Sequence, residues 1–120
     1  MTKKTPATIL ICDDDKGISD LIAIVLRARG YTVFTENNPK SVYLSLKKYA
    51  PKLLLLDLRM PGLSGEEIIR SLKKKKIACS TIIVSADKDA SKIAFEAGAD
   101  DFLYKPFDIA ALERKVAKYL

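Results

Sequence analysis

A run of four leucines, residues 53–56, constrains the fold of this chain more than any other feature of the sequence. The run is followed at once by Asp57 and then by a loop that contains Pro61 and Gly62. Four consecutive apolar residues bounded by turn residues are typical of a strand that is buried on both faces. Open α/β sheets bind their ligands beyond the carboxyl ends of such strands. The sequence therefore predicts that Asp57 lies at a functional edge of a parallel sheet.

A second group of carboxylates follows the apolar residues 9–12. Asp13, Asp14 and Asp15 stand there in succession, and neighbouring parallel strands would bring the first two close to Asp57. We expect Asp15 to cap the next helix, because acids are stabilising at a helix N-terminus. Two charges about 4 Å apart repel by roughly 4 kcal/mol at an effective dielectric constant of ~20. The cluster needs a counter-charge, and Mg²⁺, which proteins hold with carboxylates and phosphate oxygens, is the predicted cofactor.

Five repeats of a strand followed by a helix account for the rest of the chain. This alternation predicts the α/β class with a parallel sheet. We expect the first helix to end near Gly30, the second to begin at Pro39, the third to begin near Gly65, the fourth to end at Gly98 and the fifth to be capped by Asp108. The buried stripe of the fifth helix should consist of Leu112, Val116 and Leu120. The expected strands are Thr8 to Cys12, Thr32 to Glu36, Leu53 to Leu56, Thr81 to Ser85 and Phe102 to Tyr104.

The length and composition fit one globular domain over residues 1–120. The longest apolar stretches are a few residues, whereas a membrane span needs about 20, and no signal peptide is visible. We expect a cytoplasmic location and no membrane partner. The formal net charge of +6 is scattered except for four lysines, residues 73–76, which we interpret as a solvated helix end rather than a nucleic-acid surface. Cys12 and Cys79 are expected to be reduced and unbridged.

Four short motifs together carry a resemblance to a known family, and they occur in the order Asp13-Asp14, Asp57 with Met60-Pro61-Gly62, Ser85-Ala86 and Lys105-Pro106-Phe107. The chain resembles, over its whole length, the CheY-like response-regulator receiver domain of two-component phosphorelay systems. The resemblance implies a (βα)5 fold whose doubly wound, five-stranded parallel sheet has the flavodoxin-like order 2-1-3-4-5. It also implies a phosphoprotein of signal transduction that carries an aspartyl phosphate.

The resemblance implies that Asp57 is the phosphoacceptor. Asp14, Asp57 and the backbone carbonyl of Arg59 would bind Mg²⁺ directly, and Asp13 would act through water. A carboxylate can attack phosphorus to give an acyl phosphate, provided that the charge on the phosphoryl oxygens is neutralised.

The later motifs would supply the other working residues. By the resemblance, Lys105 would pair with the carboxylate and then with the phosphoryl group, after which a cis peptide bond would lead to Pro106. Ser85 would donate a hydrogen bond to a phosphoryl oxygen. Ser85 and Phe102 would also form the switch, where relatives more often have Thr and Tyr. Tyr104 should point to the face of its strand opposite to that of Lys105, and it is not assigned a switch role.

The implied function is a switch that takes a phosphoryl group onto Asp57 and changes its helix 4/strand 5/helix 5 surface to control an output. The chain has no His, so the donor would be a partner histidine kinase, a phosphotransfer protein or a small acyl phosphate. The output partner is unknown, and a homodimer formed on phosphorylation stays open. Relatives that dimerise to work a DNA-binding domain usually carry an acid where this chain has Ala110 and Ala111. Such a protein is a signalling switch, not an enzyme, apart from Mg²⁺-dependent self-phosphorylation and autodephosphorylation.

Arg59 and Asp87 occupy two positions that tune dephosphorylation in relatives, and their opposite charges could pair across the mouth of the site. An alternative function is a Mg²⁺-dependent phosphohydrolase with an Asp nucleophile. Arg59 disfavours it, because those enzymes place a second acid at this position and Arg59 supplies no general acid. A phosphorylation-independent binding module is disfavoured because every phosphorylation residue is present. A nucleotide-binding flavodoxin-like domain is disfavoured because no G-x-G-x-x-G follows the first strand.

Overall fold

A computed structural model describes residues 8–120, so the first seven residues of the predicted domain lie outside the described part. Five parallel strands form one sheet in the order β2-β1-β3-β6-β7. Counting only these five strands, this is the predicted order 2-1-3-4-5, and the fold prediction is confirmed. The strands are β1 (Thr8–Cys12), β2 (Thr32–Glu36), β3 (Leu53–Asp57), β6 (Ser80–Ser85) and β7 (Asp101–Tyr104).

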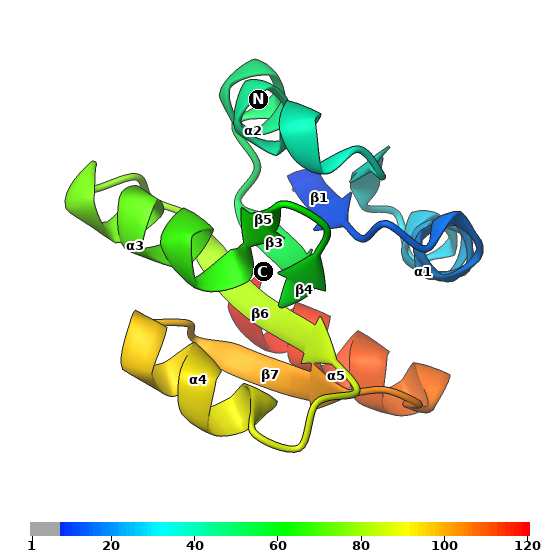
Figure 1. The fold of residues 1–120 in the computed structure, drawn as a ribbon. Helices are drawn as coiled ribbons and strands as arrows, with labels where there is room; N and C mark the ends of the chain where they lie inside the picture. The colour runs from blue at the N-terminus through cyan, green and yellow to red at the C-terminus, as the bar shows by residue number, and fades with distance from the viewer. Residues whose placement is uncertain (1–7) are drawn as a thin grey trace.

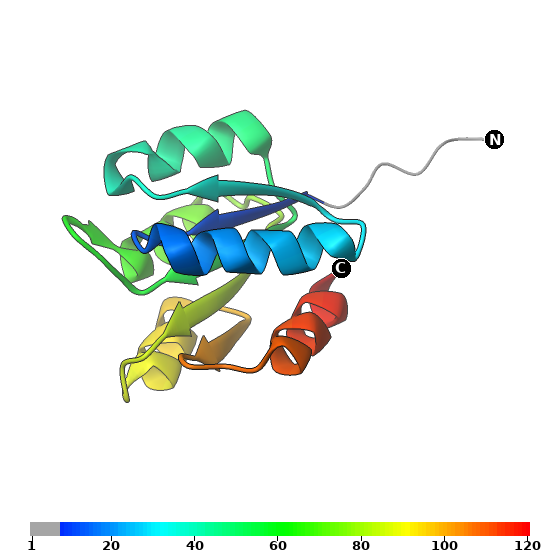
Figure 2. The same cartoon turned by 90° about the vertical axis from the view of Figure 1, so that its right-hand side faces the viewer.

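Helices cover both faces of the sheet, which gives three layers (Figures 1 and 2). The apolar core is split accordingly into two clusters, one on each side of the sheet. Side chains of α1 and α5 pack on one face, and side chains of α2, α3 and α4 pack on the other. The helices are α1 (Lys16–Ala28), α2 (Val42–Tyr49), α3 (Gly65–Lys74), α4 (Ala90–Ala97) and α5 (Ile109–Tyr119).

Alternation along the central strand explains why its sequence is apolar throughout. In β3, Leu54 and Leu56 face the α2-α3-α4 cluster, while Leu53 and Leu55 face the α1-α5 cluster. All four leucines are buried, as expected for a strand with helices on both faces. β3 lies between β1 and β6, with Leu56 opposite Cys12 and Asp57 opposite Val84. This register sets the carboxyl ends of three strands side by side.

The predicted helix ends agree with the structure in most cases. Asp15 and Asp108 cap α1 and α5 by accepting hydrogen bonds from backbone N–H groups, and Gly98 ends α4 with a positive φ of 99°. Pro39 was expected to begin the second helix, but it begins a 3-10 turn, η1 (Pro39–Ser41), which precedes α2. Leu120 was expected in the buried stripe of the last helix, but it is partly exposed, whereas Leu112 and Val116 of that stripe are buried.

A small antiparallel hairpin after β3 was not expected. It consists of β4 (Arg59–Met60) and β5 (Leu63–Ser64), and the turn between them includes Gly62 with a positive φ of 71°. Gly65 follows at the start of α3, where an added Cβ would lie 3.1 Å from the Cα of Leu58. The hairpin therefore fixes how the chain leaves Asp57 and enters α3. No helix among residues 8–120 is long and apolar enough to cross a membrane.

Candidate functional site

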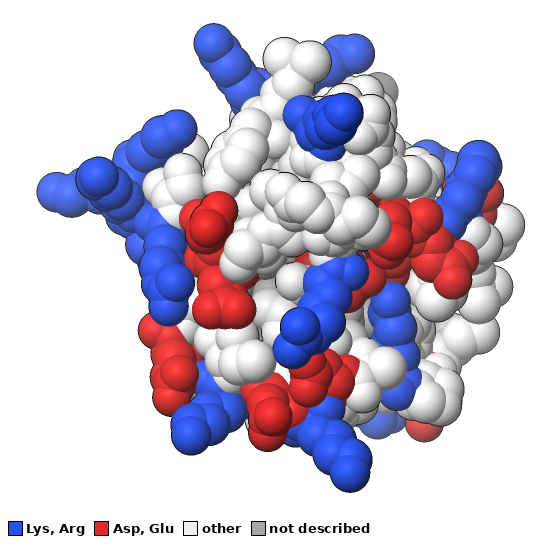
Figure 3. Space-filling view, in the orientation of Figure 1, with Lys and Arg blue, Asp and Glu red and all other residues white. Residues whose placement is uncertain are grey.

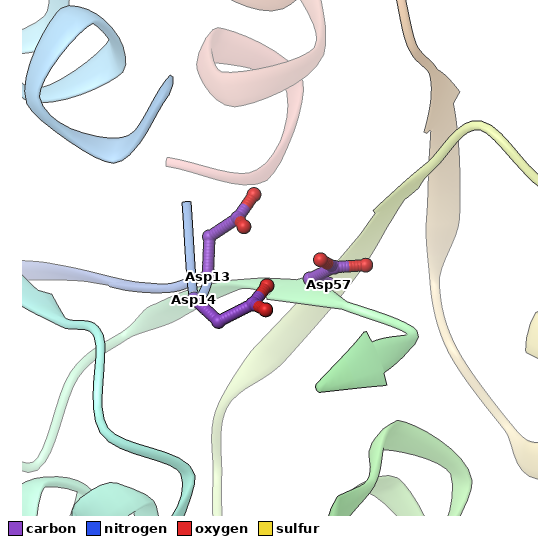
Figure 4. Close-up of side chains that lie close together, drawn as sticks. All are labelled: Asp13, Asp14 and Asp57. Atoms are coloured by element: carbon purple, nitrogen blue, oxygen red, sulfur yellow. The ribbon is translucent and has the colours of Figure 1, made fainter. Parts of the chain in front are cut away.

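Three carboxylates meet at the carboxyl edge of the sheet (Figure 4). Asp57 is the last residue of β3, and Asp13 and Asp14 follow β1, the neighbouring strand. One oxygen from each of the three lies within 4.8 Å of the others. Asp13 and Asp57 are buried, whereas Asp14 is exposed. The structure therefore brings together the three acids that the sequence predicted to cluster.

Lys105 supplies the positive charge for this cluster. Its Nζ lies 2.7 Å from Oδ2 of Asp13 and 3.6 Å from Oδ2 of Asp57. The backbone N–H of Lys105 donates to the carbonyl of Ser85 at 2.9 Å, which ties the end of β7 to β6. The peptide bond between Lys105 and Pro106 is cis, as the resemblance implied. The lysine that follows β7 is thus held against acids that come from β1 and β3.

The charges of the cluster shift the pKa of its members. Burial raises the pKa of Asp57, and the negative charge of Asp13 raises it further. The N–H of Arg59 and the ammonium of Lys105 act in the opposite direction, but the pKa stays above its ordinary value. Burial disfavours the charge on Lys105, yet its hydrogen bond to Asp13 and the charge of Asp57 outweigh burial and raise its pKa. The lysine is therefore charged at neutral pH, beside an acid whose negative charge is disfavoured.

Ser85 and Asp87 lie beside the acids at the end of β6. Ser85 is buried, and its Oγ accepts a hydrogen bond from the N–H of Asp87 at 3.1 Å. Asp87 in turn pairs with Arg59, whose Nε lies 2.6 Å from Oδ2 of Asp87. The opposite charges expected at these two positions therefore do pair. The N–H of Asp89 and the Arg59 side chain lower the pKa of Asp87, and a paired Arg59 offers no general acid for a phosphohydrolase.

Phe102 lies on β7 between two other aromatic rings. Its ring packs edge-on against Phe95 of α4, with centroids 5.8 Å apart, and against Tyr104, with centroids 4.8 Å apart. The ammonium of Lys115 lies 5.7 Å from the centre of the Phe102 ring. Phe102 is half-buried and Tyr104 is partly exposed.

Tyr104 is more closely connected to this region than the sequence reasoning allowed. Residues two apart on a strand share a face. Tyr104, which faces away from Lys105, therefore lies on the same face of β7 as Phe102. The Tyr104 hydroxyl lies 3.2 Å from the carbonyl of Lys88 and 3.2 Å from Oγ of Ser91. Tyr104 therefore links β7 to the start of α4, although it received no role from the sequence.

Asn37 is a further residue of the site that the sequence reasoning missed. Its Nδ2 donates to the carbonyl of Asp13 at 2.7 Å and to Oγ of Ser19 at 2.8 Å. The N–H of Asp13 also donates to the carbonyl of Glu36, the last residue of β2. Asn37 follows directly after β2, which is the neighbour of β1. The rule that identified Asp13 and Asp57, a polar residue directly after a strand, would also have identified Asn37.

The donor set suits a hard divalent cation. Its three side chains offer carboxylate oxygens, which are the ligands that Mg²⁺ prefers. Lys105 neutralises only one of the three negative charges. The cluster therefore keeps an excess of negative charge, which favours the binding of a cation. Asp14 is exposed and makes the cluster accessible from solvent.

The sheet order and the acidic cluster at its edge define a CheY-like α/β domain of the flavodoxin-like type. The family described as "Response regulator receiver domain" matches residues 9–117. The chain therefore belongs to the response-regulator receiver family, and this confirms the resemblance derived from the motifs.

Relatives of known sequence and structure agree with this assignment. The chain is 35% identical over 117 residues to the DNA-binding transcriptional regulator NtrC of Salmonella typhimurium, covering 92% of this chain and 25% of that protein. It is 35% identical over 104 residues to the phosphate regulon transcriptional regulatory protein PhoB of Pseudomonas aeruginosa, covering 83% and 45%. A signal receiver domain from Bermanella marisrubri has 34% identity and a TM-score of 0.87 and covers 96% of this chain and 98% of that chain. The chain thus spans a quarter to less than half of the two regulators.

Proposed function

We propose that this chain is a phosphorylation-driven switch whose phosphoacceptor is Asp57. The observation that carries the proposal is the position of the Asp57 carboxylate, which lies 3.6 Å from the ammonium of Lys105 and beside two further acids at one sheet edge. An oxygen of Asp57 forms a bond to phosphorus while the bond from phosphorus to the donor breaks. The electron pair of the broken bond leaves with the donor, which is a phosphohistidine of a partner protein or a small acyl phosphate.

The acids around Asp57 support a role for Mg²⁺ in this transfer. Asp14, Asp57 and the backbone carbonyl of Arg59 would hold the cation, and Asp13 would act through water. When bound, the cation neutralises charge on the phosphoryl oxygens. Asp13 also holds the ammonium of Lys105 at 2.7 Å, so the lysine is kept near the phosphoacceptor before the transfer.

Lys105 and Ser85 are the residues that would respond to the phosphoryl group. The Lys105 ammonium would shift from the carboxylates to a phosphoryl oxygen, which carries more negative charge. The Ser85 hydroxyl, which now accepts a hydrogen bond from Asp87, would turn to donate a hydrogen bond to another phosphoryl oxygen. The movement of Ser85, the last residue of β6, would draw the end of that strand toward Asp57.

The movement of Ser85 would be coupled to Phe102 and to the face formed by α4, β7 and α5. A shift from about 1:99 to 99:1 needs roughly 5.5 kcal/mol of differential interaction. Hydrogen bonds from Ser85 and Lys105 contribute about 1.5 to 3 kcal/mol each. We therefore expect a partial shift of population, which controls an output domain or partner. The two matched regulators are transcriptional regulators, which supports an output of that kind.

The pair formed by Arg59 and Asp87 would tune how long the phosphoryl group persists. The pair connects the hairpin after β3 to the end of β6 beside Asp57. We propose that it restricts the approach of water to the phosphoryl group, so that the aspartyl phosphate hydrolyses slowly.

Intact-mass spectrometry with acetyl phosphate tests the proposed transfer. The chain should gain the mass of one phosphoryl group in the presence of Mg²⁺ and gain little in EDTA. The variant Asp57→Asn should gain none, whereas the control Asp89→Asn, an exposed acid near the same edge, should react as the original chain does. A phosphoryl group that persists on Asp57→Asn, or that forms equally in EDTA, would sink the proposal.

A further inference from the structure

An apolar groove lies at the opposite end of the molecule from Asp57. One wall comes from α2 and the residues that follow it, including Leu44 and Pro51, and the other comes from the end of α3 and the residues beyond it, including Leu72 and Ile77. Pro51 precedes β3 and Cys79 precedes β6. The groove therefore opens at the amino ends of the central strands, and the proposed phosphoacceptor lies at their carboxyl ends.

The size and exposure of this groove are those of a ligand site. Its volume is about 650 Å³, within the range of about 300 to 1,000 Å³ found for small-molecule pockets. Leu44 of α2 is 68% exposed, and Ile77, in the loop after α3, is 49% exposed. Large apolar side chains that gather on one surface mark a binding site more often than scattered ones do.

The charged side chains of the groove all have one sign. Among the described residues that line it, the charged ones are Lys47 and Lys75, and both are exposed. Lys73, Lys74 and Lys76 stand at the same end of α3, and Figure 3 shows a group of basic side chains on the left, where α3 ends in Figure 1. An anionic group at the rim would therefore meet positive charge from both walls.

The thiol of Cys79 contributes an uncharged group to the groove. Burial, together with the negative charge of Asp100, raises the pKa of Cys79 to about 11. The thiol is therefore protonated at neutral pH, and it behaves as a small apolar group that does not repel an anion. Tyr43 and Ser71 line the groove as well, and their hydroxyls can donate hydrogen bonds to an anionic head group.

We propose that this groove binds a small amphipathic anion, a molecule with an apolar body and one carboxylate or sulfonate group. The apolar body lies against Leu44, Leu72 and Ile77, and the anionic group lies between Lys47 and Lys75. This site is separate from the phosphoacceptor and does not depend on the proposed function.

Binding of the fluorescent anion 8-anilinonaphthalene-1-sulfonate tests the proposal directly. The chain has no Trp, and the probe is excited at wavelengths that Tyr does not absorb, so a rise in fluorescence reports the probe alone. We expect saturable binding of one molecule per chain, displacement by decanoate, and weaker displacement by the uncharged decanol. The double variant Lys47→Gln/Lys75→Gln should bind about threefold to tenfold more weakly, as expected for exposed charge pairs. Lys92→Gln, which removes an exposed lysine of α4, is the matched control and should bind as the original chain does.

Two further variants locate the bound probe within the molecule. Ala78→Phe should fill the groove and abolish saturable binding while its circular dichroism stays unchanged. Asp57→Asn should bind the probe with unchanged affinity even if it also fails to accept a phosphoryl group. The proposal is overturned by non-saturable fluorescence, or by equal affinity in the double variant and the original chain. Displacement by an acidic amphipathic peptide but not by decanoate would overturn the assignment to a small molecule.

Discussion

Replacing Asp57 with Asn should stabilise the protein at neutral pH, even though it removes the proposed phosphoacceptor. The charge of Asp57 is opposed by Asp13 and Asp14, which offer oxygens within 4.8 Å. At an effective dielectric constant of ~20, each repels it by about 3.5 kcal/mol at that distance, while Lys105 at 3.6 Å attracts it by about 4.6 kcal/mol. Solvent screens the repulsion between Asp57 and the exposed Asp14, so the net repulsion is smaller than these values sum to. We therefore expect Asp57→Asn to raise the free energy of unfolding by about 1 to 2 kcal/mol.

The pH dependence of this gain follows from the raised pKa of Asp57. An acid whose pKa is higher in the folded state than in the unfolded state stabilises the fold below its unfolded pKa. That contribution is lost as the pH rises through the folded pKa. The gain from Asp57→Asn should therefore be largest at neutral pH, and it should shrink as the pH falls and Asp57 of the original chain becomes protonated.

Urea unfolding followed by circular dichroism, with EDTA present, measures this gain at pH 7 and at acidic pH. Asp89→Asn is the control, because it removes an exposed acid and should change the free energy by less than about 0.5 kcal/mol. An Asp57→Asn variant that is no more stable than the original chain at pH 7, or whose gain does not depend on pH, would refute this account of the cluster.

Three further predictions follow from the contacts of the site. Asn37→Ala should weaken Mg²⁺ binding by less than the roughly 10-fold to 100-fold typical for a partner of a direct ligand, because Asn37 holds the backbone of Asp13, which would act through water; calorimetry measures the change, and Asn38→Ala is the neighbouring control that should leave the affinity unchanged. Arg59→Gln and Asp87→Asn should each shorten the lifetime of the aspartyl phosphate, and the double variant should match the single ones because the two residues act as one pair; additive effects would contradict this. Saturation with Mg²⁺ at about 100 times its Kd should raise the unfolding free energy by about 2.7 kcal/mol, and no stabilisation in a urea titration would contradict the metal assignment.

The sheet and its acidic edge could be predicted because burial on both faces leaves a clear trace in the sequence. Each residue of β3 before Asp57 faces one apolar cluster or the other, so each must be apolar. The apolar run therefore indicates the strand, and the polar residue that ends the run indicates the edge of the sheet. Asp57 and Asp13 were found in this way. The role of Lys105 needed the resemblance, because a lysine in a chain with 21 Lys and Arg residues carries little information by itself.

The features that were missed depend on contacts between distant elements. Strands of two residues, such as β4 and β5, are too short to produce a periodic pattern. The partial exposure of Leu120 depends on which groups cover it, and the helical spacing of its stripe does not show that. The contact between Tyr104 and Phe102 was missed because the alternation of side chains along a strand was applied to Tyr104 and Lys105 but not to Tyr104 and Phe102, which share a face. Local patterns identify elements, but they do not show what covers each side chain.

Trapping the aspartyl phosphate with borohydride tests the central claim most directly. Borohydride supplies hydride to the acyl carbon and releases phosphate, so a phosphorylated aspartate is reduced to homoserine. After treatment with acetyl phosphate and Mg²⁺, peptide mass spectrometry should find homoserine at position 57 and at no other acid. Homoserine at Asp13 or Asp14, or a phosphorylated chain in which Asp57 is unchanged, would contradict the account.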